Sequence, residues 1–152
     1  MPTGRSIEAR IMAALEARLQ VNLRNIDPDH GILEPCIVRL DPPDDEPARQ
    51  LWQVDLFRAG VTAGDADDSV RDHHRLRVDL AIYAPPGDAL SDLWWRVVDL
   101  VKGTSWWPPE MADIRPLDGG AALREQAAGL RAVQMRTASF ELEFHAAQGN
   151  AF

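Results

Sequence analysis

The sequence predicts an α+β fold in which a mixed, mainly antiparallel sheet carries two main helices on one face. Two segments have the 3- and 4-residue apolar spacing of amphipathic helices. Other segments alternate apolar and polar residues, as half-buried strands do. One helix is expected before a group of three strands and the other after it, an order typical of helices packed on one face of a sheet.

Length and composition suit one globular domain spanning residues 1–152. The chain is 45% hydrophobic and 26% charged, which is ordinary for a folded protein. Its 24 acidic and 16 basic residues give a formal net charge of −8, which disfavours binding to a nucleic acid. No apolar run approaches the roughly 20 residues that cross a bilayer, so no membrane partner is expected.

The first helix is expected to begin after Ser6, a residue type that caps helix N-termini, and to end near Asn25. Apolar residues recur at every fourth position of this segment: Ile7, Ile11, Leu15, Leu19 and Leu23. This spacing places them on one buried face.

Three strands are expected next, over residues 36–40, 51–58 and 73–84. In the second strand Trp52, Val54 and Leu56 share one face, and Gln53 and Asp55 lie on the other. The third strand alternates over ten residues, which predicts one buried and one solvated face. The connections, at residues 41–50 and 59–70, are expected to be loops, the second of them an exposed hairpin loop.

The second helix is expected over residues 89–102, and Gly103 suits the position after its end. Residues 106–109, Trp-Trp-Pro-Pro, are expected to form a rigid linker. A short strand is then predicted at residues 111–117.

The remaining sequence is expected to contain one long strand at residues 130–145 and a flexible tail at 146–152. The apolar positions of the strand change parity near Ala138, which predicts a bulge or a change of partner there. Residues 121–129 fit either a helix or a loop.

No pattern of catalytic residues is found, and neither an enzyme activity nor a cofactor or metal is expected. Asp72-His73-His74 matches a short signature of two-metal phosphoesterases, but the other Asp motifs of that chemistry are missing. His73 and His74 would also point to opposite faces of a strand. The turn-rich residues 27–30 lack the pattern of a calcium loop. Cys36, the only cysteine, is expected to be a buried apolar residue.

Tryptophan is the most unusual residue class. Trp52 and Trp94 are expected in the core, whereas Trp95, Trp106 and Trp107 are candidates for an interface between subunits, where tryptophan is enriched. A second group of candidates, for an interface or a channel surface, is the acidic cluster of the second loop: Asp65, Asp67 and Asp68.

The layout of the chain resembles that of the tail terminators of long-tailed bacteriophages, the tail-completion proteins. The resemblance covers nearly all 152 residues and lies in the order of its segments. These are the helix "SIEARIMAALEARL", the strands "LWQVDLF" and "HHRLRVDLAIYA" around an acidic loop, the helix "DALSDLWWRVVDLVKG" and the closing strand "RAVQMRTASFELEFHA".

This resemblance implies a structural protein without active site or cofactor, which assembles in the host cytoplasm and resides in the neck of the virion. It implies a homo-oligomeric, hexameric ring whose partners are the tail tube protein and the head-completion proteins. DNA would only pass through its channel. The acidic loop at 59–70 would be a candidate for ring or channel contacts. Two alternatives are another neck or head-completion connector protein and, less favoured, a small metal-dependent α+β enzyme using His30, His73 or His74.

Overall fold

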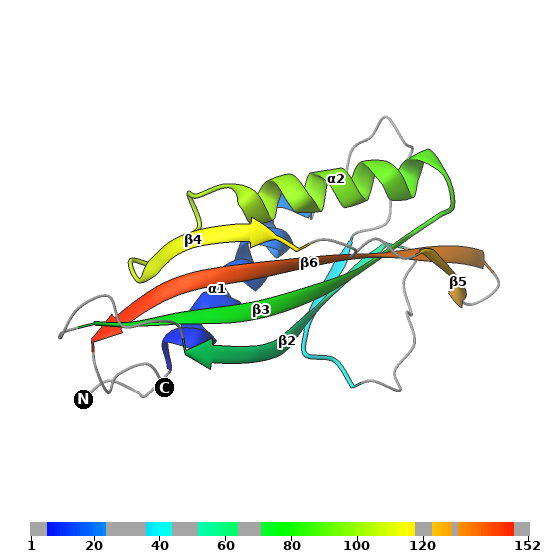
Figure 1. Ribbon diagram of the computed structural model, residues 1–152. Helices are drawn as coiled ribbons and strands as arrows, with labels where there is room; N and C mark the ends of the chain where they lie inside the picture. The colour runs from blue at the N-terminus through cyan, green and yellow to red at the C-terminus, as the bar shows by residue number, and fades with distance from the viewer. Residues whose placement is uncertain are drawn as a thin grey trace.

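A computed structural model describes residues 6–23, 36–43, 52–63, 71–117, 123–128 and 131–147 (Figure 1). Its elements are α1 (Ile7–Leu23), β1 (Ile37–Leu40), β2 (Gln53–Ala63), β3 (Arg71–Ala84), α2 (Asp88–Lys102), β4 (Met111–Pro116), β5 (Leu123–Ala128) and β6 (Arg131–Ala147). The expected order of a helix, three strands, a second helix and further strands is confirmed.

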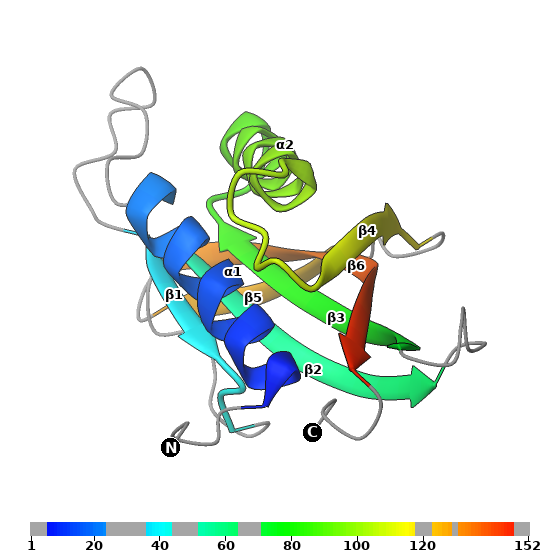
Figure 2. The ribbon, with the colours of Figure 1, turned by 90° about the vertical axis from the view of Figure 1, so that its left-hand side faces the viewer.

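The strands form one six-stranded sheet with the order β1-β2-β3-β6-β4, and β5 also pairs with β6. β1 runs parallel to β2, and every other pair is antiparallel. Both helices lie on the same side of the sheet (Figure 2). The predicted α+β class, with a mixed sheet and helices on one face, is therefore confirmed.

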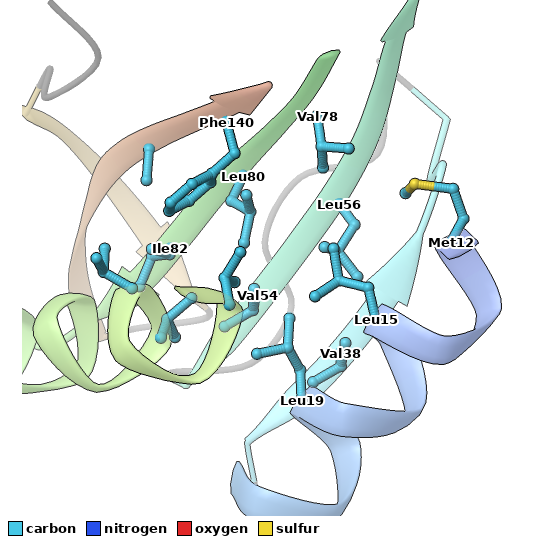
Figure 3. Close-up of a cluster of buried hydrophobic side chains, with 14 of the residues drawn as sticks. Met12, Leu15, Leu19, Val38, Val54, Leu56, Val78, Leu80, Ile82 and Phe140 are labelled. Atoms are coloured by element: carbon cyan, nitrogen blue, oxygen red, sulfur yellow. The ribbon is translucent and has the colours of Figure 1, made fainter. Parts of the chain in front are cut away.

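Helix α1 begins where the sequence predicts it. The backbone N–H of Ala9 donates to Ser6 Oγ at 3.0 Å, so Ser6 caps the helix. The apolar residues at every fourth position of α1 are buried. Leu15 and Leu19 point toward Val38 and Val54 of the sheet (Figure 3).

Helix α2 runs antiparallel to α1. Arg96 Nη2 donates to the carbonyl oxygen of Asn22 at 3.2 Å, and Gly103 lies beside Arg18. The backbone of Gly103 is extended, with a φ of −66°, so a left-handed conformation is not the reason for a glycine there. A Cβ atom at this position would lie 3.3 Å from Arg18 Nη2, a close contact that a small shift of the long side chain would relieve.

The predicted loop at 59–70 is wrong for its first residues, because β2 continues to Ala63. The pairing of β2 with β3 shifts between Arg58 and Gly60, and Gly60 has a φ of +144°, which favours glycine. This bulge turns Val61 toward the main core, against which it packs. Residues 64–70 lie outside the described part of the chain.

The interpretation of residues 121–129 as a helix or a loop is also wrong, because Leu123–Ala128 forms β5. The composition Leu-Arg-Glu-Gln-Ala-Ala suits a helix, but pairing with Arg131–Arg136 of β6 overrides it. Ala128 pairs with Arg131, so only two residues separate the strands.

The predicted change near Ala138 is a change of partner. β5 pairs with β6 before Ala138 and β4 pairs with it after, both on the edge opposite β3. The register between β6 and β3 continues through this point without a bulge. β6 also extends to Ala147, so the predicted tail at 146–152 begins too early.

Replacing Ser6 by alanine is expected to lower the free energy of unfolding by about 1 kcal/mol, because the first turn of α1 loses its cap. Urea denaturation followed by circular dichroism measures this change. Ser105→Ala, at an exposed position outside the helices, is the control and should stay within about 0.5 kcal/mol of the wild type. An equal loss in both variants would contradict the assignment of Ser6 as the cap.

Candidate functional site

The side of the sheet that faces away from the helices carries a network of ion pairs. We call it the charged sheet face, and it consists of Arg75, Arg77, Asp79, Arg115, Glu141 and Glu143. β3 and β6 pair here so that Leu76 opposite Leu142 points to the helices and the flanking residues point away. Arg75 Nε lies 3.5 Å from Glu143 Oε1, Arg115 pairs with Glu141, and Arg77 Nε lies 3.1 Å from Asp79 Oδ1.

The arginines are the outermost groups of this face. The side chains of Arg75, Arg77 and Arg115 are 44%, 56% and 50% exposed. Glu141 and Glu143, at 22% and 16%, lie beneath them. The hydrogen bond from Arg115 to Glu141 raises the pKa of the guanidinium above its usual value. The charged sheet face therefore presents guanidinium groups at the surface.

On the opposite side of the molecule, α2 presents its own outward stripe. We call it the helix stripe: Asp88, Asp92, Trp95 and Asp99, all of which are exposed. The exposed cations Arg96 and Lys102 border it. Trp95 is 56% exposed, which is unusual for so large an apolar side chain. Its ring meets that of Trp94 edge to face, with the centroids 4.8 Å apart.

Trp94 lies at the border of the core. Its Nε1 donates to the carbonyl oxygen of Thr137 at 3.0 Å, and the guanidinium of Arg136 lies 3.8 Å from the ring centroid. Trp94 is only partly buried, so the core prediction holds fully for Trp52, which is 5% exposed, and in part for Trp94.

Trp106 and Trp107, the other interface candidates, are partly buried and pack against the main core. Trp106 Nε1 donates to the carbonyl oxygen of Val101 at 3.0 Å and so ties the linker to the last turn of α2. Of the three candidate tryptophans, Trp95 alone is exposed. Asp65, Asp67 and Asp68 lie outside the described residues, so the structure does not place them beside Trp95.

The alternative of a metal-dependent enzyme would need a cluster of metal-binding side chains, and the described part of the chain contains none. The side chain of His74 is buried and stacks on Phe144, with the ring centroids 5.3 Å apart. His30 and the side chain of His73 lie outside what is described. Among the described residues, no group of three or more His, Cys, Asp and Glu side chains is arranged to hold a metal ion.

Sequence reasoning missed a buried ion pair at the other end of the same sheet side. Asp55 is 2% and Gln53 1% exposed, although the alternation placed these polar residues on the face opposite Trp52, Val54 and Leu56. Arg39 binds Asp55 in a bidentate pair, Nε to Oδ1 at 2.8 Å and Nη2 to Oδ2 at 2.7 Å, and Gln53 Nε2 donates to Oδ1 at 3.1 Å.

A small apolar cluster adjoins this pair, so the sheet side is not solvated along its whole length. Ala81, Tyr83 and Met135 are buried there, and Phe57 packs against them. The expectation of a wholly solvated second face for residues 73–84 is therefore wrong at Ala81 and Tyr83, although it is right for Arg75 and Arg77.

Cys36 is buried, as expected for an apolar role. Burial, and to a smaller degree the negative charge of Asp55, raises the pKa of its thiol to about 12. The thiol is therefore protonated at neutral pH and is a poor nucleophile.

Neither a protein-family model nor a curated protein matches this sequence. One solved structure, of a protein whose name states no activity, is similar at 15% identity, covering 93% of this chain and 98% of the other. Its TM-score is 0.45, too low to support any statement about this chain. Within the described residues, no helix has both the length and the apolar character needed to span a membrane.

Replacing Asp55 by alanine is expected to lower the free energy of unfolding by about 3 kcal/mol, because the partly buried Arg39 guanidinium loses its carboxylate. Urea denaturation measures the change. The double variant Arg39→Leu/Asp55→Leu should be more stable than the single variant. The control Asp79→Ala removes a more exposed carboxylate and should cost less than about 1 kcal/mol. Equal losses from Asp55→Ala and Asp79→Ala would contradict the role of the buried pair.

The Cys36 thiol is expected to react with a disulfide reagent at pH 8 at least about a hundredfold more slowly in the folded protein than in guanidinium chloride. The absorbance of the released thiolate gives both rates. An exposed cysteine introduced by Ser105→Cys in the same chain serves as the control and should react rapidly in both conditions. Rapid labelling of Cys36 in the folded wild type would show that the thiol is accessible.

Proposed function

We propose that this chain is a tail terminator of a long-tailed phage or prophage. In this role it forms a ring that caps the tail tube and joins it to the head. The observation that carries the proposal is that two unlike exposed surfaces, the charged sheet face and the helix stripe, lie on opposite sides of the fold. Identical subunits that close into a ring use such unlike surfaces, each copy offering one face to each neighbour.

The order of the elements supports the same proposal. The layout that resembles tail terminators requires a helix, paired strands, a second helix and a long closing strand. The described elements follow this order from α1 to β6. A fold alone does not determine a function, so the exposed faces are needed beside it.

The charge of the chain is compatible with a channel through which DNA passes. The formal net charge is −8, and an acidic wall repels phosphates and does not retain them. We propose Asp65, Asp67 and Asp68 as the channel-facing acids, with the tail tube and the head-completion proteins as partners and the virion neck as the location.

The purified protein is expected to form a ring of six 16.9-kDa chains, with a mass of about 100 kDa, on its own or on tail tubes. Native mass spectrometry and negative-stain images with added tail tubes test this. A protein that stays monomeric at every concentration and never binds tube ends would contradict the proposal.

The same experiment separates the alternatives. A ring that binds DNA-filled heads but not tail tubes would favour another neck or head-completion connector. Stoichiometric metal in the purified protein would favour the small metal-dependent enzyme.

A further inference from the structure

We propose that the helix stripe of one copy docks on the charged sheet face of a second copy, with Trp95 at the centre of the contact. This inference rests on the proposed ring and names the two surfaces that would build it. Both surfaces belong to the described part of the chain, and each has a feature that the other complements.

The Trp95 side chain is unusually exposed. Of the described residues, only Val21 and Trp95 are large apolar side chains that are mostly exposed, at 69% and 56%. Tryptophan is one of the residue types enriched at the energetic centre of interfaces. The edge-to-face contact with Trp94 also restrains the Trp95 ring, so docking would cost little side-chain entropy.

Charged side chains of the helix stripe lie beside Trp95. Asp92 lies one helical turn before it and Asp99 one turn after it, so carboxylates flank the indole on the same stripe. The exposed Arg96 follows Trp95 but reaches toward α1, where its Nη2 donates to the carbonyl oxygen of Asn22. The outermost groups of the charged sheet face are guanidinium groups, of which Arg77 is the most exposed at 56%. A guanidinium can bind a carboxylate and cover an aromatic ring at the same time.

The molecule already contains one such arrangement. The guanidinium of Arg136 lies 3.8 Å from the ring centroid of Trp94, the neighbour of Trp95. Arg77 of a second copy could cover Trp95 in the same way, and the aspartates would add charge-assisted hydrogen bonds. The other exposed apolar residue, Val21, has Ala17 one turn earlier in place of an acid, so it lacks this complementarity.

The positions of the two surfaces on one subunit also favour this contact. The helix stripe faces away from the sheet, and the charged sheet face points away from the helices, so the two lie on opposite sides of one subunit (Figures 1 and 2). A contact between them leaves the second surface of each copy available for another neighbour. Such a heterologous contact continues from copy to copy and closes into a ring when its rotation permits.

Two double variants test the pairing of these surfaces. Asp92→Arg/Trp95→Ala changes the helix stripe, and Arg75→Glu/Arg77→Glu changes the charged sheet face. All four positions are on the surface, and thermal unfolding checks that both variants are folded. Val21→Ala is the matched control at the other exposed apolar position.

Sedimentation velocity is expected to show that each double variant fails to assemble, with subunit dissociation constants raised at least tenfold, while Val21→Ala assembles like the wild type. An equimolar mixture of the two variants is expected to form a heterodimer and nothing larger. Each variant retains one intact surface, so the intact pair can form one contact. The two changed surfaces are opposite in charge but lack Trp95, the centre of the contact, so a second contact is not expected.

Three results would overturn the inference while leaving the ring itself intact. Assembly of both double variants like the wild type would show that other surfaces build the ring. Loss of assembly in both without a heterodimer on mixing would show that the surfaces do not meet each other. Retained assembly with lost binding to tail tubes in Asp92→Arg/Trp95→Ala would assign the helix stripe to the tube.

A wild type that stays monomeric and never binds tube ends would instead overturn the proposed ring, and the contact can then be tested separately. The NMR signal of the Trp95 indole N–H would be followed as the protein concentration rises. A shift that is absent from Arg75→Glu/Arg77→Glu would support the contact, and a constant signal would overturn it.

Discussion

The long pairing of β3 with β6 is the interaction on which the rest of the structure depends. It runs in one register from Arg71 opposite Ala147 to Ala84 opposite Gln134. Because strand side chains alternate, this ladder sends one set of residues to the helices and the other set away from them. Val78 and Phe140 enter the core on one side, and Arg77 and Glu141 join the charged sheet face on the other. A slip of one residue would exchange the two sets.

This constraint also explains how much of the fold the sequence could predict. The helices and the central strand were predictable because their apolar spacing is long and regular, from Ile7 to Leu23 in α1 and from His74 to Ile82 in β3. The extension of β2 was missed because the bulge at Gly60 moves Val61 onto the apolar face and interrupts the alternation. β5 was missed because its residues suit a helix, and only pairing with β6 makes them a strand.

The candidate site could be predicted only in part. Trp95 was identified from its residue type, and its exposure agrees with an interface role. The charged sheet face was visible as alternating arginines in β3, but the glutamates that pair with Arg75 come from β6, more than 60 residues later in the chain. The burial of Asp55 could not be predicted, because alternation indicates which side a residue faces and not whether that side is covered. The tertiary structure therefore adds the partners that lie far apart in the sequence, which the local pattern does not contain, whereas Arg77 and Asp79 pair within one strand.

The pairing of β3 with β6 forms the charged sheet face and supports the helices, and we propose that this face and the helix stripe join the copies of the ring. The most direct test is a cryo-electron microscopy map of the assembled protein on the end of a tail tube. The account predicts a closed ring in which the Trp95 side chain of every copy contacts the charged sheet face of the next copy. A map in which no ring forms, or in which Trp95 faces solvent within the ring, would contradict it.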